Sequence, residues 1–236
     1  MSADILFDLD GTLIDSSPGI LASFERVLAA HGLAPVVPLE ASLIGPPLAA
    51  TLRKVSGLGE IGDEALLGRL VEAFKQDYDT AGYRTTEVFP GVAAGLAQLA
   101  GAGARLFIVT NKRMVPTRRI LEALGLAPLF AGIHTRDETE PPAPSKAAVT
   151  QRVLGRYGID GGRAFFVGDS DEDAAAAREN GLAFILAAYG YGAAGNPQGP
   201  PSVVAGRPDA ELARFADLPG LIARLSPTCT VEREDS

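Results

Sequence analysis

Asp8 and Asp10 end a short apolar run near the start of the chain, in the stretch ILFDLDGTLID at positions 5–15. A later apolar run ends in Asp169, and Asp173 follows four residues on. Carboxylates at the end of a buried strand are costly to desolvate, and two of them about 4 Å apart repel by roughly 4 kcal/mol at an effective dielectric constant of about 20. A site holding all four could keep them ionised only around a cation. Because no His or Cys accompanies these oxygen ligands, Mg²⁺ is the expected metal.

Residues of a different character stand at the ends of other apolar runs. Thr110 ends the run RLFIVT, Asn111 follows it, and Lys146 opens a helical stretch further along. Their side chains offer hydrogen-bond donors and one positive charge. A metal on one side of a site and donors on the other is the arrangement that stabilises a transferring phosphoryl group. The two sets of residues together predict phosphoryl chemistry.

The elements that must position these residues alternate along the chain. Strand-like apolar runs are separated by segments with helical spacing, and the runs are ILF at 5–7, RLFIVT at 105–110, GIHT at 132–135, AFFVGD at 164–169 and LAFILAA at 182–188, with a weaker one at about 210–213. Such alternation predicts a parallel sheet, and ligands bind beyond the carboxyl ends of its strands. The expected fold class is therefore α/β, a Rossmann-like core with a mostly parallel sheet and helices on both faces.

Residues 16–85 separate the first strand-like run from the others and have helical character, broken by Pro and Gly clusters. We predict that they form an all-helical cap inserted after the first strand. Residues 1–15 and 86–226 would then form a discontinuous α/β catalytic core, and residues 227–236 a flexible tail. A cap joined to the core by two short connections can rock as a lid that excludes water from the site.

The composition limits the partners that we expect. The 236 residues carry a formal net charge of −8, which argues against nucleic acid or an anionic membrane as partner. No apolar run approaches the roughly 18 residues that span a bilayer. Cys229 is the single cysteine, so neither a disulfide nor a Cys-built zinc site is expected. We expect a cytoplasmic protein, a monomer or homodimer, that acts on a small metabolite.

The motifs DLDGT at 8–12, VTNK at 109–112 and VGDSDED at 167–173, with a lysine between the last two, occur in this order. In this respect the chain resembles the haloacid dehalogenase-like phosphatase superfamily, over nearly its whole length. The helical insertion is similar to the small cap of that superfamily. IGPPL at 44–48 and YGYG at 189–192 resemble, more narrowly, its phosphoglycolate phosphatase-like branch.

The resemblance implies a role for each matching residue. Asp8 would be the nucleophile that forms an aspartyl-phosphate, and Asp10 the general acid and then base. Thr110 and the backbone of Asn111 would hold phosphoryl oxygens. Lys146 would neutralise charge between the nucleophile and the phosphate.

The same resemblance implies a set of metal ligands. Asp8, Asp169 and the main-chain carbonyl of Asp10 would bind Mg²⁺, and Asp173 would act directly or through water.

One position departs from the pattern of the superfamily. Many relatives place the basic residue directly before a Pro, but here Pro141 stands at that place and Lys146 follows five residues later. A long side chain can reach the site from either place. Lys146 is the assignment that we carry forward, with Lys112 and Arg136 as the alternatives.

The cap offers weaker candidates for substrate selection. Gly45 and Pro46 belong to a stiff turn that could present backbone groups to a small substrate, and Arg53 and Lys54 could meet a substrate carboxylate. A helix boundary and a solvated helix face explain the same residues nearly as well or better.

The leading hypothesis is a Mg²⁺-dependent phosphatase for a small phosphomonoester, with 2-phosphoglycolate favoured by the branch resemblance. A 5′-nucleotidase or pyrophosphatase would share the core and differ in the cap. A phosphosugar mutase would have to protect its phosphoenzyme from water. A phospho-accepting signalling switch is the alternative outside the enzymes. Asp10, a base two residues from the phosphoaspartate, should however promote rapid hydrolysis of that phosphoaspartate.

Overall fold

The computed structural model describes residues 3–59, 63–194 and 207–225. The predicted tail at 227–236 and Cys229 lie outside these residues. The helices are α1 (Ser17–Ala30), α2 (Leu48–Ser56), α3 (Glu64–Thr80), α4 (Val92–Gly101), α5 (Met114–Ala123), α6 (Lys146–Tyr157), α7 (Asp171–Glu179), α8 (Tyr191–Ala194) and α9 (Leu218–Leu225). The strands are β1 (Asp4–Phe7), β2 (Ile14–Asp15), β3 (Glu87–Val88), β4 (Arg105–Thr110), β5 (Gly132–Thr135), β6 (Ala164–Gly168), β7 (Ala183–Ala187) and β8 (Ala210–Leu212).

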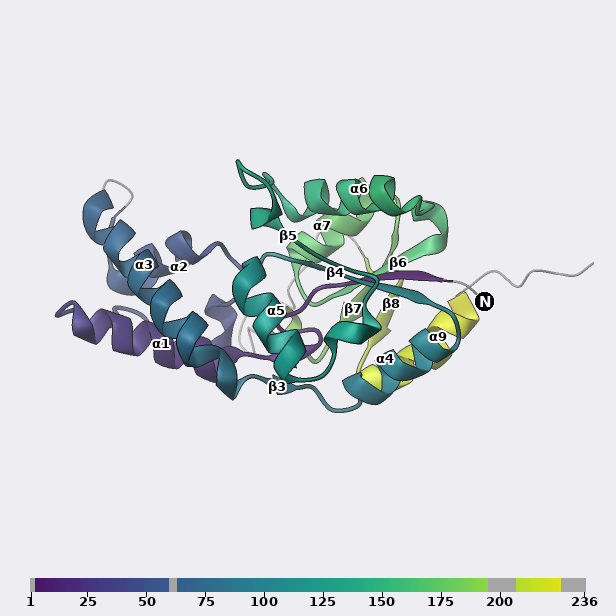
Figure 1. Ribbon diagram of the computed structural model, residues 1–236, viewed down its shortest axis with the longest axis horizontal. Helices are drawn as coiled ribbons and strands as arrows, with labels where there is room; N and C mark the ends of the chain where they lie inside the picture. Colours follow the sequence, from purple (N-terminus) through teal and green to yellow (C-terminus); the bar gives the residue numbers. More distant parts are fainter. Residues whose placement is uncertain (1–2, 60–62, 195–206, 226–236) are drawn as a thin grey trace, which may run out of the picture.

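Six of these strands form one parallel sheet in the order β5-β4-β1-β6-β7-β8 (Figure 1). The chain leaves β1 at the centre and returns to β4 on one side and β6 on the other. A topological switch point therefore lies at β1, where parallel sheets bind their ligands. The α/β fold class predicted from the sequence is confirmed.

Side chains alternate between the two faces of the sheet. In β1, Ile5 and Phe7 join the apolar core under α4, α5 and α9, whereas Leu6 joins the core under α6 and α7. The same alternation holds in β4, where Leu106 and Ile108 face one core and Phe107 and Val109 the other. Both faces are covered by helices, as Figure 1 shows, so the buried middle of β1 and of β4 is apolar on both faces. Polar residues stand at the strand ends, with Asp4 and Arg105 at the amino ends and Thr110 at the carboxyl end of β4.

Helices α1, α2 and α3 form a separate lobe with its own apolar core, which includes Phe24, Leu52 and Phe74. The chain enters the lobe through β2 and leaves it through β3, and the two pair antiparallel as a short ribbon. The helical insertion after the first strand is thus confirmed. The domain limits at 16–85 and 86–226 stay a prediction. The lobe formed by α1, α2 and α3 is called the cap below.

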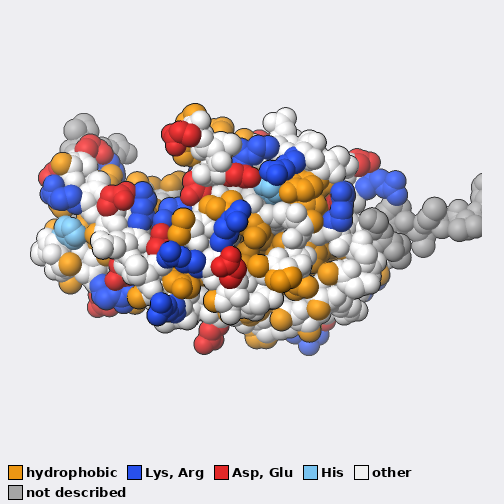
Figure 2. Space-filling view, viewed as in Figure 1, with side chains coloured by type: hydrophobic (Ala, Val, Ile, Leu, Met, Phe, Trp, Pro, Cys, Tyr) orange, Lys and Arg blue, Asp and Glu red, His pale blue; other side chains and the backbone are white. Residues whose placement is uncertain are grey.

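The two lobes are visible in the space-filling view, whose outline is indented between the cap and the core (Figure 2). Acidic and basic side chains are interspersed on the face shown there. None of the helices among the described residues has the length and apolarity required to cross a membrane.

Candidate active site

The carboxyl end of the central strands brings the predicted acidic residues together. Asp8 follows β1 directly and its amide donates to the carbonyl of Val167 in β6 at 3.0 Å, so it is fixed as an extension of the sheet. Asp169 follows β6, and Asp173 lies in the first turn of α7. Oxygens of these three carboxylates lie within 4.8 Å of one another, and all three side chains are buried.

Burial makes this acidic group hard to ionise. Desolvation raises the pKa of Asp8 to about 8, against the lowering effect of Lys146, and the charges of Asp173 and Asp169 raise it further. Desolvation and Asp173 raise the pKa of Asp169 to about 6. A divalent cation among the three would offset the cost of ionising all of them. Three carboxylate oxygens are ligands that suit a hard cation, so the group could bind a metal ion.

Lys146 supplies the positive charge next to this group. Its ammonium lies 2.6 Å from Oδ1 of Asp173 and 2.9 Å from Oδ1 of Asp8, with 4% of the side chain exposed. Burial by itself would lower the pKa of Lys146, but Asp173 and Asp8 outweigh it and raise that pKa. The lysine therefore stays charged in the site.

The segment before α6 explains why a lysine at the shifted position reaches the site. Arg136, the second alternative, donates from Nε to the carbonyl of Ala143 and from Nη2 to that of Pro144, both at 2.8 Å. Its guanidinium thus holds the segment that leads into Lys146. The side chain of Ser145 accepts from the amide of Ala148 and starts α6 at that lysine.

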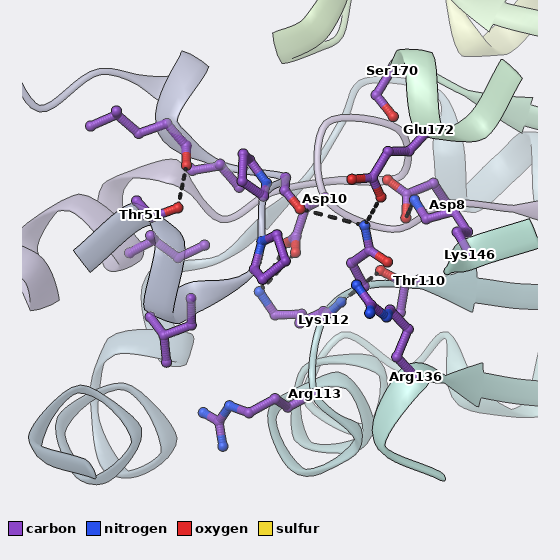
Figure 3. Close-up of a pocket in the computed structure, with 18 of the residues that line it drawn as sticks. Asp8, Asp10, Thr51, Thr110, Lys112, Arg113, Arg136, Lys146, Ser170 and Glu172 are labelled. Carbon is purple, nitrogen blue, oxygen red and sulfur yellow. Dashed lines mark hydrogen bonds and ion pairs between the residues drawn. The ribbon is translucent and has the colours of Figure 1, made fainter. Parts of the chain in front are cut away.

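The carboxylate of Asp10 does not join the acidic group, contrary to our expectation of four carboxylates around one cation. It lies 3.0 and 3.1 Å from Nζ of Lys112 (Figure 3). It also accepts from Oγ of Ser16 at 2.5 Å. Lys112, the first alternative to Lys146, is therefore the partner of Asp10 rather than of Asp8. The predicted metal role of Asp10 involved its main-chain carbonyl, and that role stays a prediction.

Thr110 and Asn111 lie beside the acidic group at the end of β4. Oγ1 of Thr110 accepts from the amide of Lys112 at 3.2 Å. The side-chain amide of Asn111 donates to Glu172 of α7 and, at 3.5 Å, to the carbonyl of Gly45 in the cap. Both residues line the same cavity as Asp8 and Lys146, as the phosphate-binding prediction requires.

The YGYG motif braces the acidic group and the ribbon into the cap. The hydroxyl of Tyr189 donates to the carbonyl of Thr12 at 2.7 Å, and that of Tyr191 donates to Asp15 at 2.6 Å. Burial and the bond to Asp15 raise the pKa of Tyr191, which keeps its hydroxyl protonated. The amide of Gly192 donates to Oδ2 of Asp169 at 2.9 Å.

Gly190 allows this loop to lie against the acidic group, because any Cβ there would collide with Cβ of Asp169 and the carbonyl oxygen of Gly11. We expect Gly190→Ala to lower stability by about 1–3 kcal/mol and to reduce activity by displacing Asp169. Thermal unfolding and phosphate release measure the two effects. Gly155→Ala on α6 is the matched control, since a Cβ there meets nothing within 4 Å and should leave stability unchanged or slightly higher. Equal melting temperatures of the two variants would contradict the prediction.

The cavity between cap and core has a volume of about 510 Å³. Asp8, Asp10, Thr110, Asn111 and Lys146 line its core side. Its cap side is mostly apolar and is formed by Ile20, Phe24, Leu43, Leu48, Phe74 and Tyr78.

The predicted cap residues divide into two pairs. Gly45 and Pro46 line the cavity, whereas Arg53 and Lys54 do not. Arg53 instead donates to the carbonyl of Gly59 and pairs with Glu64 at 2.6 Å inside the cap. Lys54 is exposed. The structure therefore gives no support to Arg53 and Lys54 as substrate-contacting residues.

Several contacts at the site were not predicted from the sequence. Glu172 binds Asn111, Tyr191 binds Asp15, and Arg113 forms two bonds of 2.6 and 2.8 Å with Asp79 of the cap. Arg113 directly follows the VTNK motif, and this position was the signal that could have marked it. Asp79 carries no comparable signal, because its partner is set by how the cap docks.

A parallel sheet with a switch point at β1, a helical cap and buried carboxylates with a lysine at the strand ends define a capped α/β enzyme. The family model described as haloacid dehalogenase-like hydrolase matches residues 5–187. The chain therefore belongs to the haloacid dehalogenase-like hydrolase family.

Individual relatives are similar over most of this chain. The phosphoglycolate phosphatase of Yersinia pseudotuberculosis is 33% identical over 216 residues, which cover 91% of this chain and 90% of the relative. The tyrosine-protein kinase PtkA of Mycobacterium tuberculosis is 35% identical over 191 residues, 80% of this chain, but the match spans only 63% of the length of PtkA. The crystal structure of a predicted phosphoglycolate phosphatase from Haemophilus somnus superposes with a TM-score of 0.76 at 25% identity, covering 93% of this chain and 97% of the other.

Proposed function

We propose that the protein is a Mg²⁺-dependent phosphatase that hydrolyses a small organic phosphomonoester through an aspartyl-phosphate on Asp8, with 2-phosphoglycolate as the first candidate substrate. The observation that carries the proposal is the position of Asp8 in the cavity wall. Its carboxylate lies 2.9 Å from a buried lysine and in one group with two further carboxylates. The names of the curated relatives support the substrate.

In the first step, a carboxylate oxygen of Asp8 would attack phosphorus and the bond from phosphorus to the ester oxygen would break. Asp10, in its protonated form, would give its proton to the leaving oxygen, which departs as the alcohol. Lys146 would neutralise charge on the phosphoryl oxygens, while Thr110 and the backbone of Asn111 hold them.

In the second step, water would attack phosphorus of the aspartyl-phosphate. Asp10, now a carboxylate, would take the proton of the water, and the bond from phosphorus to the Asp8 oxygen would break to release inorganic phosphate. Asp10 returns protonated and Asp8 returns as a carboxylate, so the cycle closes.

The acidic group fits a magnesium ion. Asp8 and Asp169 would hold it, with Asp173 in direct contact or through water, and the metal would supply positive charge to the transferring phosphoryl group when bound. Asp173 already accepts from Ser170 and Lys146, so its orientation is fixed by this chain alone.

The first experiment is phosphate release from a substrate panel with excess Mg²⁺ and with EDTA. The panel holds 2-phosphoglycolate, sugar phosphates, nucleoside monophosphates and pyrophosphate. We expect kcat/KM to be highest for 2-phosphoglycolate. Chelation should lower the rate by at least about 100-fold, because the transferring phosphoryl group then lacks the positive charge that the metal would supply.

Other outcomes of this panel separate the alternatives. If a nucleoside monophosphate or pyrophosphate had the highest kcat/KM, the phosphatase mechanism would stand and 2-phosphoglycolate would be rejected as the preferred substrate. A stable phospho-Asp8 without release would favour a mutase or a switch. Since PtkA is named a tyrosine-protein kinase, a further arm with ATP and the protein alone tests for phosphotyrosine, and its formation without phosphate release would contradict a phosphatase.

A further inference from the structure

The loop after β4 connects the catalytic residues of the core to the cap. Three consecutive side chains of this loop contact cap residues: Asn111 reaches the carbonyl of Gly45, Lys112 reaches the ring of Tyr78, and Arg113 pairs with Asp79. The same loop begins at Thr110, where the phosphate is proposed to bind. The loop therefore contacts both the cap and the proposed phosphate site.

Lys112 is the member of this loop that also contacts Asp10. Its ammonium lies 3.0 and 3.1 Å from the two carboxylate oxygens of Asp10 and 4.8 Å from the centroid of the Tyr78 ring. Only 5% of its side chain is exposed. Ser16, where the chain enters the cap, also donates from Oγ to Oδ1 of Asp10 at 2.5 Å. Asp10 is thus held between the ribbon that leads into the cap and a lysine that rests on the cap.

We propose that Lys112 is a positioning residue for Asp10, and that the Tyr78 ring makes this positioning depend on a docked cap. The inference rests on the proposed function, because it assigns Lys112 to the acid and base of that reaction. With the cap docked, the ring of Tyr78 covers the ammonium, which aligns both oxygens of Asp10. When the cap moves away, the ammonium loses that aromatic contact and becomes solvated, so its hold on Asp10 weakens.

The geometry explains why a lysine is needed in addition to Ser16. One hydroxyl fixes a single oxygen of the carboxylate and leaves the group free to rotate about that bond. The ammonium contacts both oxygens and removes this freedom. A displacement of about 1 Å in a catalytic group can cost about 100-fold in rate, so the alignment has a large kinetic consequence.

The two chemical steps separate this role from a general structural one. The test substrate is p-nitrophenyl phosphate, whose leaving group departs without a proton, so phosphorylation of Asp8 should depend little on Asp10. Hydrolysis of the aspartyl-phosphate needs Asp10 as a carboxylate, the form that pairs with an ammonium. For Lys112→Met we expect a burst of p-nitrophenolate equal to the enzyme concentration, then a steady state about 10–100-fold slower than wild type with no rise in KM.

Three companion variants test the parts of the proposal. Lys112→Arg keeps the charge and should recover to within about 5-fold of wild type. Tyr78→Phe keeps the aromatic face and Tyr78→Leu removes it, so the burst followed by slow turnover should appear in Tyr78→Leu and be weaker or absent in Tyr78→Phe. Melting temperatures of all four variants identify any that fail to fold.

Some results would overturn the proposal. Equal loss of the burst and of the steady state in folded Lys112→Met would show a role unrelated to Asp10. Matching kinetics of Tyr78→Phe and Tyr78→Leu would show that the positioning of Asp10 does not depend on the aromatic ring of the cap. If wild type released no phosphate, the proposed function would fail. Hydrogen exchange would then test separately whether Lys112 and the Tyr78 ring hold the cap against the core. Lys112→Met and Tyr78→Leu should both speed exchange in the last turn of α3, and Tyr78→Phe should not; equal exchange in all three would refute the link.

Discussion

Asp8→Asn is expected to abolish phosphate release, lowering kcat by at least about 10⁴-fold, while leaving the protein folded. The amide has nearly the same shape as the carboxylate but cannot attack phosphorus, so no aspartyl-phosphate can form. Acid-quenched wild type should carry one phosphate on the peptide that contains Asp8, and the variant should carry none. Peptide mass spectrometry measures this, and it also detects any deamidation of the Asn back to Asp.

The thermal stability of Asp8→Asn shows whether a loss of activity comes from the missing nucleophile or from unfolding. Burial raises the pKa of Asp8 to about 8, from an ordinary value of 3.8. Between these values the folded state keeps a proton that the unfolded state has released, so metal-free wild type loses stability as pH rises through this window. Asn has no such loss, and the variant should melt at or above wild type at neutral pH without metal.

Asp4→Asn makes the same change at the other end of β1, where Asp4 pairs with Arg105 at 2.6 Å. It should leave phosphate release unchanged, because Asp4 stands at the amino end of β1 and the candidate active site lies beyond its carboxyl end. Substantial turnover by Asp8→Asn free of deamidated protein would refute the covalent mechanism.

The sheet was predictable because its signal is local. Buried parallel strands are apolar on both faces, and the runs that form β1, β4 and β6 are each followed or ended by a polar residue at the carboxyl edge of the sheet, namely Asp8, Thr110 and Asp169. The order of the strands was not predicted, because the apolar runs do not show on which side of β1 each later strand adds, and the connection from β1 to β4 contains the whole cap. The ribbon of β2 and β3 was not predicted, because it consists of two pairs of residues, Ile14 with Val88 and Asp15 with Glu87, joined across the whole cap.

The site was predictable at the level of which strand ends meet, but not at the level of which side chains pair. Asp8, Asp169, Asp173 and Lys146 come together as the sequence predicts. The partner of Asp10 could not be read in this way, since either buried lysine could reach it until the backbone direction after Thr110 was known. Arg53 was a weak candidate for contact with a substrate carboxylate, and its pairing with Glu64 could not be predicted because it depends on how α2 packs against α3.

Lys146→Met is expected to lower both activity and stability, because it removes the cation that the protein itself places among three buried carboxylates. Leaving a buried charge without its partner costs about 3–5 kcal/mol, and here the partners are Asp8 and Asp173. Phosphate release should fall by at least about 100-fold, since the phosphoryl oxygens lose a buried positive charge. Mg²⁺ should raise the melting temperature of the variant by more than it raises that of wild type, because the metal then becomes the only cation in the group.

Lys75→Met is the matched control for this change, since Lys75 is a partly exposed residue of α3 that pairs with Glu72 one helical turn away. Exposed pairs contribute about 0–1 kcal/mol, so this variant should match wild type in melting temperature, in its response to Mg²⁺ and in turnover. Thermal scans at several Mg²⁺ concentrations, with and without EDTA, compare the three proteins. If Lys146→Met kept wild-type activity, Lys146 would not be the residue that neutralises the phosphate. A melting temperature of Lys146→Met that did not respond to Mg²⁺ would argue that the three carboxylates are not a metal site, because their repulsion would then be relieved by protonation alone.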